Sequence, residues 1–382
     1  MTANTLNIVA DEHIWGVQEA CSYLSPYNVQ LCILQAKDIT AEALKSANIL
    51  LTRSSTQVDA SLLAGSKVRF AGTATIGDDH YDKTWLDANQ IAWATAAGSS
   101  TDSVLEYILA ALLELHEQRK LDLSSMTLGV IGAGRIGGQL VNICRALGIK
   151  VLVNDPPRQR LTQGDNFVAL QELLNQADVL TLHTPLIKNG SDKTYHLLAD
   201  AQFQEFQGSV IINAARGACV DNLALLHWLN SQRDNAAVLD CWENEPAIFT
   251  KLLHHKQCMI ATPHIAGHSL DGKAANTQYI YNALCDYLGI EAVWNAQDEL
   301  PKLSYHDDDR IESWYDLHEK IEQFYPLMQD HLNLIKGEGC IADRFVYLRR
   351  HYPVRRAWKK QSKALSQILH ANAHTRLHIG SF

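Results

Sequence analysis

The stretch TLGVIGAGRIGGQLVNICRALG, residues 127–148, joins an apolar run, a glycine-rich turn and a helical pattern. The apolar run predicts a buried strand, and the pattern after the turn predicts a helix. Gly132, Gly134 and Gly137 have the spacing GxGxxG. The first glycine permits a tight turn, the second lets a pyrophosphate approach the backbone, and the third lets helix and strand pack closely. The stretch therefore predicts an α/β unit that binds a dinucleotide.

Two further features indicate which dinucleotide this unit binds. Arg135 and Ile136 open the predicted helix, whose free N–H groups and dipole favour a phosphate at this end. Asp155 ends the next predicted strand, 21 residues after Gly134, where a carboxylate can accept hydrogen bonds from ribose hydroxyls. That carboxylate would repel a 2′-phosphate, so the sequence predicts NAD rather than NADP, although Arg158 lies close by.

Outside this unit, short β-rich runs alternate with helical stretches. Such alternation is typical of parallel sheets with helices on both faces. The runs before residue 100 are 6–11, 29–34, 48–54, 68–75 and 91–98, and the later ones are 150–155, 177–185, 208–216, 236–242 and 259–265. The later runs are mainly apolar, as expected of strands covered on both faces. We therefore predict an α/β fold with two doubly wound, Rossmann-like parallel sheets.

Long helical patterns divide the chain into domains. A helix expected at about 103–119 is apolar almost all round, which predicts burial, and we interpret it as the crossover between two domains. Ser103 and Glu106 are placed to form a capping box near its start. The predicted domains are a substrate (lid) domain at 1–100 completed by a return helix at 270–289, an NAD-binding domain at 101–269, and a smaller C-terminal α+β domain at 290–382 with a strand near 344–348.

The composition is that of a globular protein with more than one core. The chain has 382 residues, 47% of them hydrophobic, and a net charge of -9 at pH 7. No apolar run approaches the roughly 18 residues that a membrane span needs, and the N-terminus lacks the pattern of a signal peptide. The 8 cysteines stand singly, so we expect free thiols, a cytoplasmic protein and no metal site.

Charge is unevenly distributed over the last part of the chain. Residues 297–330 are rich in acids, and residues 340–382 are rich in Lys and Arg. A basic tail can bind nucleic acid. This one carries no known nucleic-acid motif, so we favour acidic and basic segments that face each other within one domain or across a dimer. We expect no nucleic-acid partner.

Three polar side chains follow successive predicted strands in the second half of the chain. They are Arg216, Glu245 and His264. Ligands of open parallel sheets gather at the carboxyl ends of strands. Oxidation of a secondary alcohol requires a base, and histidine titrates in the appropriate range. A carboxylate on the far ring nitrogen would fix the tautomer, and a guanidinium can hold the carboxylate of a 2-hydroxy acid. We therefore predict these three residues as the catalytic groups.

With these residues, the chain resembles the D-isomer-specific 2-hydroxyacid dehydrogenases. The matching stretches are GVIGAGRIGG, HTPL, INAARGACVDNLAL, LDCWENEP and TPHIAG. The resemblance implies that Arg216 binds substrate, that His264 is the acid/base and that Glu245 orients it. It also implies that a further set of residues lines the NAD site, together with the glycine-rich turn. This set is Asp155, Thr184, Asp240 and Gly267.

Other stretches resemble a branch of this family that oxidises a phosphorylated D-2-hydroxy acid and carries a C-terminal domain used for dimerisation. They are TRSST, FAGTATIGDDHYD, NDPPR and FVYLRRHYPVRRAW. By this resemblance Ser54, Thr75 and His268 would contact the substrate, and the protein would be a homodimer. Position 268 departs from the branch, which usually has tyrosine there. The basic residues considered for the substrate phosphate are Arg53, Arg344, Arg349 and Arg350.

Two alternatives stay open at this point. The substrate could be another D-2-hydroxy acid, such as 3-phosphoglycerate, because the sequence defines the substrate pocket poorly. The chain could also be an NAD-sensing binding protein on a dehydrogenase scaffold, since a fold does not determine a function. The complete set of Arg216, Glu245 and His264 favours the enzyme.

Overall fold

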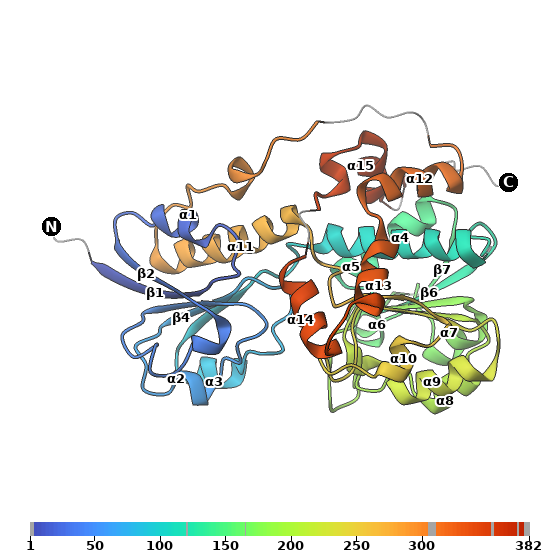
Figure 1. The fold of residues 1–382 in the computed structure, drawn as a ribbon, viewed down its shortest axis with the longest axis horizontal. Coiled ribbons are helices and arrows are strands. Elements are labelled where there is room, and N and C mark those ends of the chain that lie inside the picture. Colours follow the sequence, from blue (N-terminus) through green and yellow to red (C-terminus); the bar gives the residue numbers. More distant parts are fainter. Residues whose placement is uncertain are drawn as a thin grey trace. The chain divides into compact units, whose positions relative to one another are not determined.

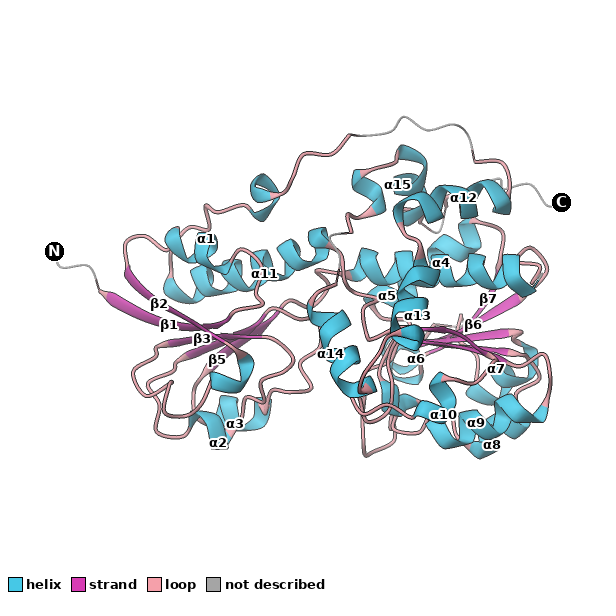
Figure 2. Cartoon of the chain, viewed as in Figure 1, coloured by secondary structure: helices cyan, strands magenta, loops and turns pink. Residues whose placement is uncertain are grey.

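A computed structural model describes residues 4–119, 121–164, 166–304, 311–352, 355–372 and 374–377. The chain forms two compact units. One consists of Met1–Ser100 with Ser269–Lys302, and the other of Thr101–His268 with Leu303–Phe382. Figure 1 shows the course of the chain and Figure 2 its helices and strands. Each unit is built around one parallel sheet.

A five-stranded sheet in the order β2-β1-β3-β4-β5 forms the centre of the first unit. Its strands are β1 (Thr5–Asp11), β2 (Asn28–Leu34), β3 (Ile49–Thr52), β4 (Phe70–Thr73) and β5 (Ala92–Thr95). Helices α1 (Val17–Ser22) and α11 (Leu270–Leu288) cover one face, and α2 (Ala60–Leu63) and α3 (Lys83–Ala88) cover the other (Figure 1). Short 3-10 helices lie at η1 (Ala36–Asp38) and η3 (Ala296–Glu299).

Burial on both faces explains why these strands are apolar throughout. Successive side chains of a strand point to opposite faces. On β1, Ile8 packs into the core that contains α1 and α11, whereas Val9 packs into the core of the opposite face. On β3, Ile49 and Leu50 divide in the same way. Removal of this apolar surface from water stabilises the unit.

A six-stranded parallel sheet in the order β11-β10-β9-β8-β6-β7 forms the centre of the second unit. Its strands are β6 (Thr127–Ile131), β7 (Lys150–Asn154), β8 (Val179–Leu182), β9 (Val210–Asn213), β10 (Ala236–Leu239) and β11 (Cys258–Ala261). The connecting helices are α4 (Thr101–Arg119), α5 (Arg135–Ala146), α6 (Pro156–Thr162), α7 (Leu170–Gln176), α8 (Asp200–Glu205), η2 (Gly217–Cys219), α9 (Asn222–Ser231) and α10 (Thr250–Leu253). Helices α4 and α5 cover one face, and α7 to α10 cover the other (Figure 1).

The predicted α/β fold with two parallel sheets is confirmed, and each predicted run contains an observed strand. Helix α4 is buried from Ser103 to Leu115, as its apolar pattern predicted. The capping box predicted for Glu106 is wrong, because the Glu106 carboxylate turns into the protein and accepts a hydrogen bond from the Trp358 backbone instead. Among the described helices, none combines the length and apolar character needed to cross a membrane.

The C-terminal helices pack into the cores of the second unit. They are α12 (Trp314–Phe324), α13 (Leu327–Lys336), α14 (Ile341–Arg350), η4 (Trp358–Lys360) and α15 (Lys363–Leu369). Trp314 and Trp358 join the core of α4 and α5, whereas Leu334 and Phe345 join the core of the opposite face. The residues from Leu303 onward group with the second unit. A separate C-terminal domain at 290–382 stays a prediction.

Residues 344–348, where we expected a strand, belong to helix α14. Phe345 is buried, whereas Tyr347 is 61% exposed. Ile341 and Leu348 pack against the same core as Phe345, and this spacing of four and three residues is helical. Aromatic and β-branched residues favoured a strand in the sequence, but the apolar period of 3.6 prevails. In the described residues from 311 onward, the regular elements are helices.

The helical assignment of this segment predicts that substitution of Phe345 lowers stability much more than substitution of Tyr347. Phe345→Ala should lower the free energy of unfolding by about 3–5 kcal/mol, because it leaves a cavity in the core. Tyr347→Ala should change it by less than about 0.5 kcal/mol, because the side chain is exposed. Urea denaturation followed by circular dichroism measures both. Equal losses would indicate a shared face, as in a strand, and would contradict the helix.

Candidate active site

Arg216, Glu245 and His264 follow three neighbouring strands of the second sheet. Strands β9, β10 and β11 are adjacent and parallel, so their carboxyl ends share one edge. Arg216 follows β9, Glu245 follows β10 and His264 follows β11, and each is half-buried. The structure therefore brings the three residues to the same edge of the sheet, where ligands of such folds bind.

Glu245 and His264 form a direct pair. Oε1 of Glu245 lies 2.7 Å from Nδ1 of His264, and the side chains are 25% and 26% exposed. Because a carboxylate accepts hydrogen bonds, this contact assigns a proton to Nδ1. In the neutral imidazole Nε2 is then the acceptor, with a lone pair that can take a proton. The pair has the geometry of a histidine base oriented by an acid.

The electrostatic surroundings of Glu245 favour its ionised form. Burial by itself would raise the pKa of Glu245, but His264, Arg349 and Arg216 lower it, so that the pKa lies below its ordinary value. His264 acts through its 2.7 Å contact, and Arg349 and Arg216 act through their charges. A charged Glu245 is the form that stabilises a positive charge on His264 during proton transfer.

The backbone at His264 is held in an unusual conformation by Asp240. His264 has a φ of 56°, in the left-handed region that residues other than glycine seldom adopt. Its N–H donates to the carbonyl oxygen of Asp240 at 2.8 Å. The Asp240 carboxylate, which is 1% exposed, accepts from the N–H groups of Ile265 and Ala266 and from the Thr262 hydroxyl. Strain of this kind persists where the surroundings fix it, commonly at active sites.

The loop that carries Glu245 is anchored through Trp242 and Glu243, which precede Glu245. Trp242 Nε1 donates to the carbonyl oxygen of Thr262 at 2.9 Å, which ties the loop to the His264 segment. Glu243 Oε1 lies 2.6 Å from Nε2 of His196, and its Oε2 accepts from the Asn222 N–H at 3.3 Å. These contacts limit the positions that Glu245 can adopt.

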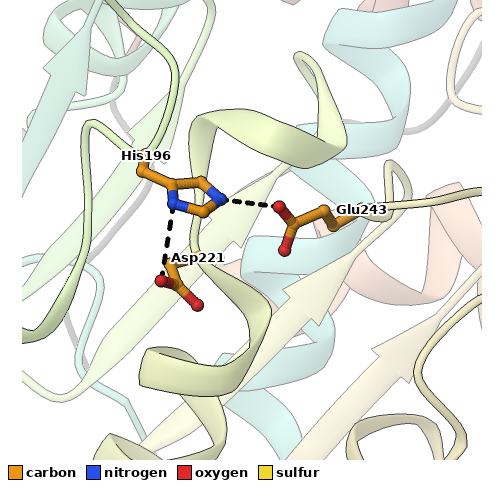
Figure 3. A group of neighbouring side chains, drawn as sticks. All are labelled: His196, Asp221 and Glu243. Carbon is orange, nitrogen blue, oxygen red and sulfur yellow. Dashed lines mark hydrogen bonds and ion pairs between the residues drawn. The ribbon is translucent and has the colours of Figure 1, made fainter.

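His196, Asp221 and Glu243 form a second polar cluster next to this loop (Figure 3). Their potential ligand atoms all lie within 4.8 Å of one another, which a metal ion would require. Each ring nitrogen of His196 faces a different carboxylate, with Nδ1 3.5 Å from Asp221 and Nε2 2.6 Å from Glu243 (Figure 3). Asp221 also caps helix α9. We therefore interpret the cluster as a hydrogen-bonded network that supports the Glu245 loop.

Arg216 is positioned by a close approach of two backbone segments. A Cβ atom at Gly217 would lie 1.9 Å from the carbonyl carbon of Trp242, so only glycine fits after Arg216. Arg216 Nη1 donates to the carbonyl oxygen of Ala215 at 2.8 Å. Its charge lowers the pKa of Glu245.

The glycine-rich turn has the shape that a dinucleotide requires. Gly132 has a φ of 89°, and a Cβ at Gly137 would lie 1.9 Å from the carbonyl oxygen of Gly132. A Cβ at Gly134 would meet nothing within 4 Å, so this glycine leaves open space before the helix. Arg135, exposed, and Ile136, half-buried, begin α5. The turn therefore fits a pyrophosphate at the N-terminus of α5.

The residues around this turn also fit NAD. Asp155 follows β7, and its Oδ2 accepts from the Ala133 N–H at 2.8 Å, which places the carboxylate beside the turn. Arg158 donates from Nη1 to the Ala133 carbonyl oxygen at 2.7 Å. Thr184 lies against Gly132, since its Cγ2 would be 3.0 Å from a Cβ there. Gly267 follows the Asp240-bound segment and is half-buried. Asp240 itself uses its carboxylate to hold that segment.

The predicted substrate contacts belong to different units. Ser54 and Thr75 lie in the first unit, beyond the carboxyl ends of the neighbouring strands β3 and β4. The Thr75 hydroxyl donates to the Gly77 carbonyl oxygen at 2.8 Å. His268 belongs to the second unit, where its ring lies edge-on to Tyr352 with centroids 5.8 Å apart.

The four basic residues considered for a phosphate differ in their surroundings. Arg53 donates to the carbonyl oxygen of His13 at 2.9 Å. Arg344 donates to the carbonyl oxygen of Gly337, and Arg350 is exposed at the end of α14. Among these four, Arg349 also lowers the pKa of Glu245 by its charge. This electrostatic effect is the reason to prefer Arg349 among the C-terminal arginines.

Sequence reasoning missed the residues that support the site. Asp221 and Glu243 offered partial signals, because Asp221 precedes a helix and Glu243 stands two residues before Glu245. His196 offered none, since its contacts with Asp221 and Glu243 span 25 and 47 residues. Such pairs form only once the fold is complete.

Comparison with known proteins agrees with this geometry. A family model described as "D-isomer specific 2-hydroxyacid dehydrogenase, NAD binding domain" matches residues 108–266. The erythronate-4-phosphate dehydrogenase of Azotobacter vinelandii is 42% identical over 359 residues, 92% of this chain and 93% of that protein. The one from Pseudomonas syringae pv. tomato is 39% identical over 97% of this chain and 100% of that protein.

Solved structures share the fold at lower identity. The D-lactate dehydrogenase of Aquifex aeolicus, complexed with NAD and lactic acid, has a TM-score of 0.61 at 23% identity and covers 74% of this chain and 96% of its own. The NAD-bound 3-phosphoglycerate dehydrogenase of Entamoeba histolytica has a TM-score of 0.62 at 21% identity and covers 75% and 96%. At these identities the likeness establishes the fold alone.

A nucleotide-binding turn and an Arg–Glu–His set at one sheet edge define an NAD-dependent dehydrogenase of 2-hydroxy acids. The chain belongs to the D-isomer-specific 2-hydroxyacid dehydrogenase family and, within it, to the group of the erythronate-4-phosphate dehydrogenases. The predicted family and the predicted cofactor, NAD, are thereby confirmed.

The open space at Gly134 predicts a variant that folds but binds NAD poorly. Gly134→Ala creates no clash and costs at most about 1 kcal/mol as a poorer helix cap. The methyl group should occupy the space needed by the pyrophosphate and weaken NAD binding about tenfold or more, which corresponds to about 1.4 kcal/mol. Titration calorimetry measures the affinity. Gly190→Ala, with a strained φ of 91° in an exposed loop, is the control that should bind NAD normally. Unchanged affinity in Gly134→Ala would contradict the cofactor site.

Proposed function

We propose that the protein oxidises 4-phospho-D-erythronate at C2 to 2-oxo-3-hydroxy-4-phosphobutanoate. The relatives that match nearly the whole chain carry erythronate-4-phosphate in their name, which supports this substrate. The contact that carries the proposal is the 2.7 Å hydrogen bond between Glu245 and His264, because it prepares one ring nitrogen for proton transfer. As the resemblance implies, the reaction would serve the synthesis of pyridoxal phosphate (vitamin B6).

In the proposed reaction, His264 removes the proton of the substrate hydroxyl. Nε2 accepts this proton from the C2 hydroxyl, while the C2–H bond breaks and a carbonyl forms. The positive charge that develops on the imidazole lies beside the Glu245 carboxylate, which stabilises it. Glu245 also keeps the ring in the tautomer in which Nε2 is the acceptor. Proton removal by a placed histidine accelerates such steps by about 10²–10⁴-fold.

Arg216 is proposed to bind the acid group and the reacting oxygen of the substrate. A guanidinium presents parallel donors that match a carboxylate, and its charge polarises the C2 oxygen as the carbonyl forms. Gly132, Gly134, Arg135, Ile136, Gly137 and Asp155 would hold the dinucleotide, together with Thr184, Asp240 and Gly267. When bound, NAD accepts the hydride from C2.

We propose that residues identified from the sequence recognise the rest of the substrate. Ser54, Thr75 and His268 are proposed contacts of the hydroxy acid. Arg349, whose charge lowers the pKa of Glu245, is the proposed partner of the phosphate in the second unit. A homodimer in the cytoplasm is proposed from the resemblance alone.

The activity of purified protein tests this proposal. With NAD, 4-phospho-D-erythronate should give NADH absorbance faster than 3-phosphoglycerate or D-lactate. His264→Ala should lower the rate by about 10²–10⁴-fold, as expected for loss of an acid/base group. His227→Ala is a matched control, because that histidine is exposed on α9 and its side chain is 64% exposed. NAD binding without turnover would favour an NAD sensor, and equal rates with 3-phosphoglycerate would overturn the proposed substrate.

A further inference from the structure

Glu106 and Arg355 form an ion pair inside the second unit. Glu106 lies on α4 and is 0% exposed, and Arg355 follows α14 and is 7% exposed. Arg355 Nη1 donates to Glu106 Oε2, and the other carboxylate oxygen accepts from the Trp358 N–H at 2.7 Å. Buried charges are costly unless they are paired and hydrogen-bonded. Glu106 therefore fixes the guanidinium of Arg355 in one place.

The same guanidinium reaches the end of the catalytic segment. Arg355 Nη2 donates to the carbonyl oxygen of His268 at 3.2 Å. Its face lies over the ring of Tyr325, 4.1 Å from the centroid, which further restricts its orientation. One arginine thus joins the crossover helix, the C-terminal region and the segment 262–268 that carries His264.

Two further contacts attach the beginning of this segment to the same elements. The hydroxyl groups of Tyr107 on α4 and Thr262 lie 2.8 Å apart. The Ala261 N–H donates to Nδ1 of His331 on α13 at 3.0 Å. The segment is therefore held at its start by α4 and α13, and at its end by Arg355. Between these points lies His264 with its left-handed backbone.

The ring of His268 also rests against the C-terminal region. Tyr352 lies edge-on to His268, and its hydroxyl donates to Oδ2 of Asp330 at 2.7 Å. An edge-on aromatic contact fixes ring orientation as well as burying apolar surface. Both the backbone and the side chain of His268 are thus set by residues of the C-terminal region.

We propose that Arg355, fixed by Glu106, is a positioning residue for the catalytic segment 262–268. This inference rests on the proposed function and assigns the C-terminal region a part in catalysis within its own chain. The hydrogen bond from Arg355 fixes the backbone of the segment at His268. Asp240 can then hold His264 in its left-handed conformation opposite Glu245. Without the hydrogen bond from Arg355 the segment loses a contact that fixes it at His268, and the imidazole loses its alignment. An arginine that served stability alone would need only its bond to Glu106.

A double variant separates positioning from stability. Glu106→Gln with Arg355→Met removes both charges together, so that neither is left buried and unpaired, and an amide oxygen at position 106 can still accept the Trp358 N–H. We expect a normal melting temperature and NAD affinity, but a kcat for 4-phospho-D-erythronate lower by about tenfold or more, as misplaced catalytic groups cause. The matched control is Asp102→Asn with Lys359→Met, which removes a partly exposed ion pair between the same two segments and should leave kcat unchanged.

The histidine ring signals in NMR spectra give a readout that does not depend on turnover. In protein labelled with 15N-histidine and saturated with NAD, the His264 and His268 signals should shift in the double variant, whereas the His227 signal should not. If the wild-type protein turns over no 4-phospho-D-erythronate, the proposed function fails, and the spectra still test the positioning. Wild-type kcat together with unshifted His264 signals would overturn the inference.

A single conservative variant covers the case in which the double variant does not fold. Arg355→Lys keeps a charge beside Glu106 but cannot bridge to His268 at the same time, because an ammonium lacks the arginine fork. We expect a melting temperature close to that of the wild type, with a lower kcat and an altered pH profile. Unchanged kcat and pH profile in this variant would contradict the positioning role.

Discussion

The conformation of His264 depends on one buried carboxylate. Asp240 binds the Thr262 hydroxyl and two backbone N–H groups of the segment 262–268, and its own carbonyl accepts the N–H of His264. Burial raises the pKa of Asp240, while His264 and these hydrogen bonds oppose the shift. The contacts offset the strain of a left-handed histidine and direct its ring to Glu245. A base placed in this way loses little freedom when substrate binds.

Around this centre, each supporting group restricts a neighbour rather than touching a reactant. Trp242 ties the Glu245 loop to Thr262, and the next residue, Glu243, ties the loop to His196 and Asn222. Arg355 holds the end of the segment at His268. The contacts around the site thus restrict the positions of Glu245 and His264. Precision of this kind is what proton transfer requires.

The sequence predicted the features that local chemistry determines. The spacing of Gly132, Gly134 and Gly137 identified the nucleotide turn, because each position has a steric reason that does not depend on distant residues. The apolar strands placed Arg216, Glu245 and His264 at one edge, because parallel strands end together. These inferences needed only the order of the strands and the hydrophobic pattern.

The sequence could not predict what distant segments contribute. Glu106 stood in an apolar helix and suggested a cap, but its partner Arg355 lies 249 residues further along the chain. Phe345 stood among residues that favour strands, and its burial against the second unit produced a helix instead. In both cases tertiary packing outweighed local preference, and no spacing rule connects the partners. An acid in an otherwise apolar helix was the signal that a buried partner exists.

A crystal structure of the dead-end complex with NADH and 4-phospho-D-erythronate would show whether His264 is placed to act on C2. We expect Nε2 of His264 to lie within about 3 Å of the C2 hydroxyl oxygen. We also expect Nδ1 to remain on Glu245 and the guanidinium of Arg216 to bind the substrate carboxylate. A C2 hydroxyl bound to other groups, with the imidazole directed away from it, would show that His264 is not the base.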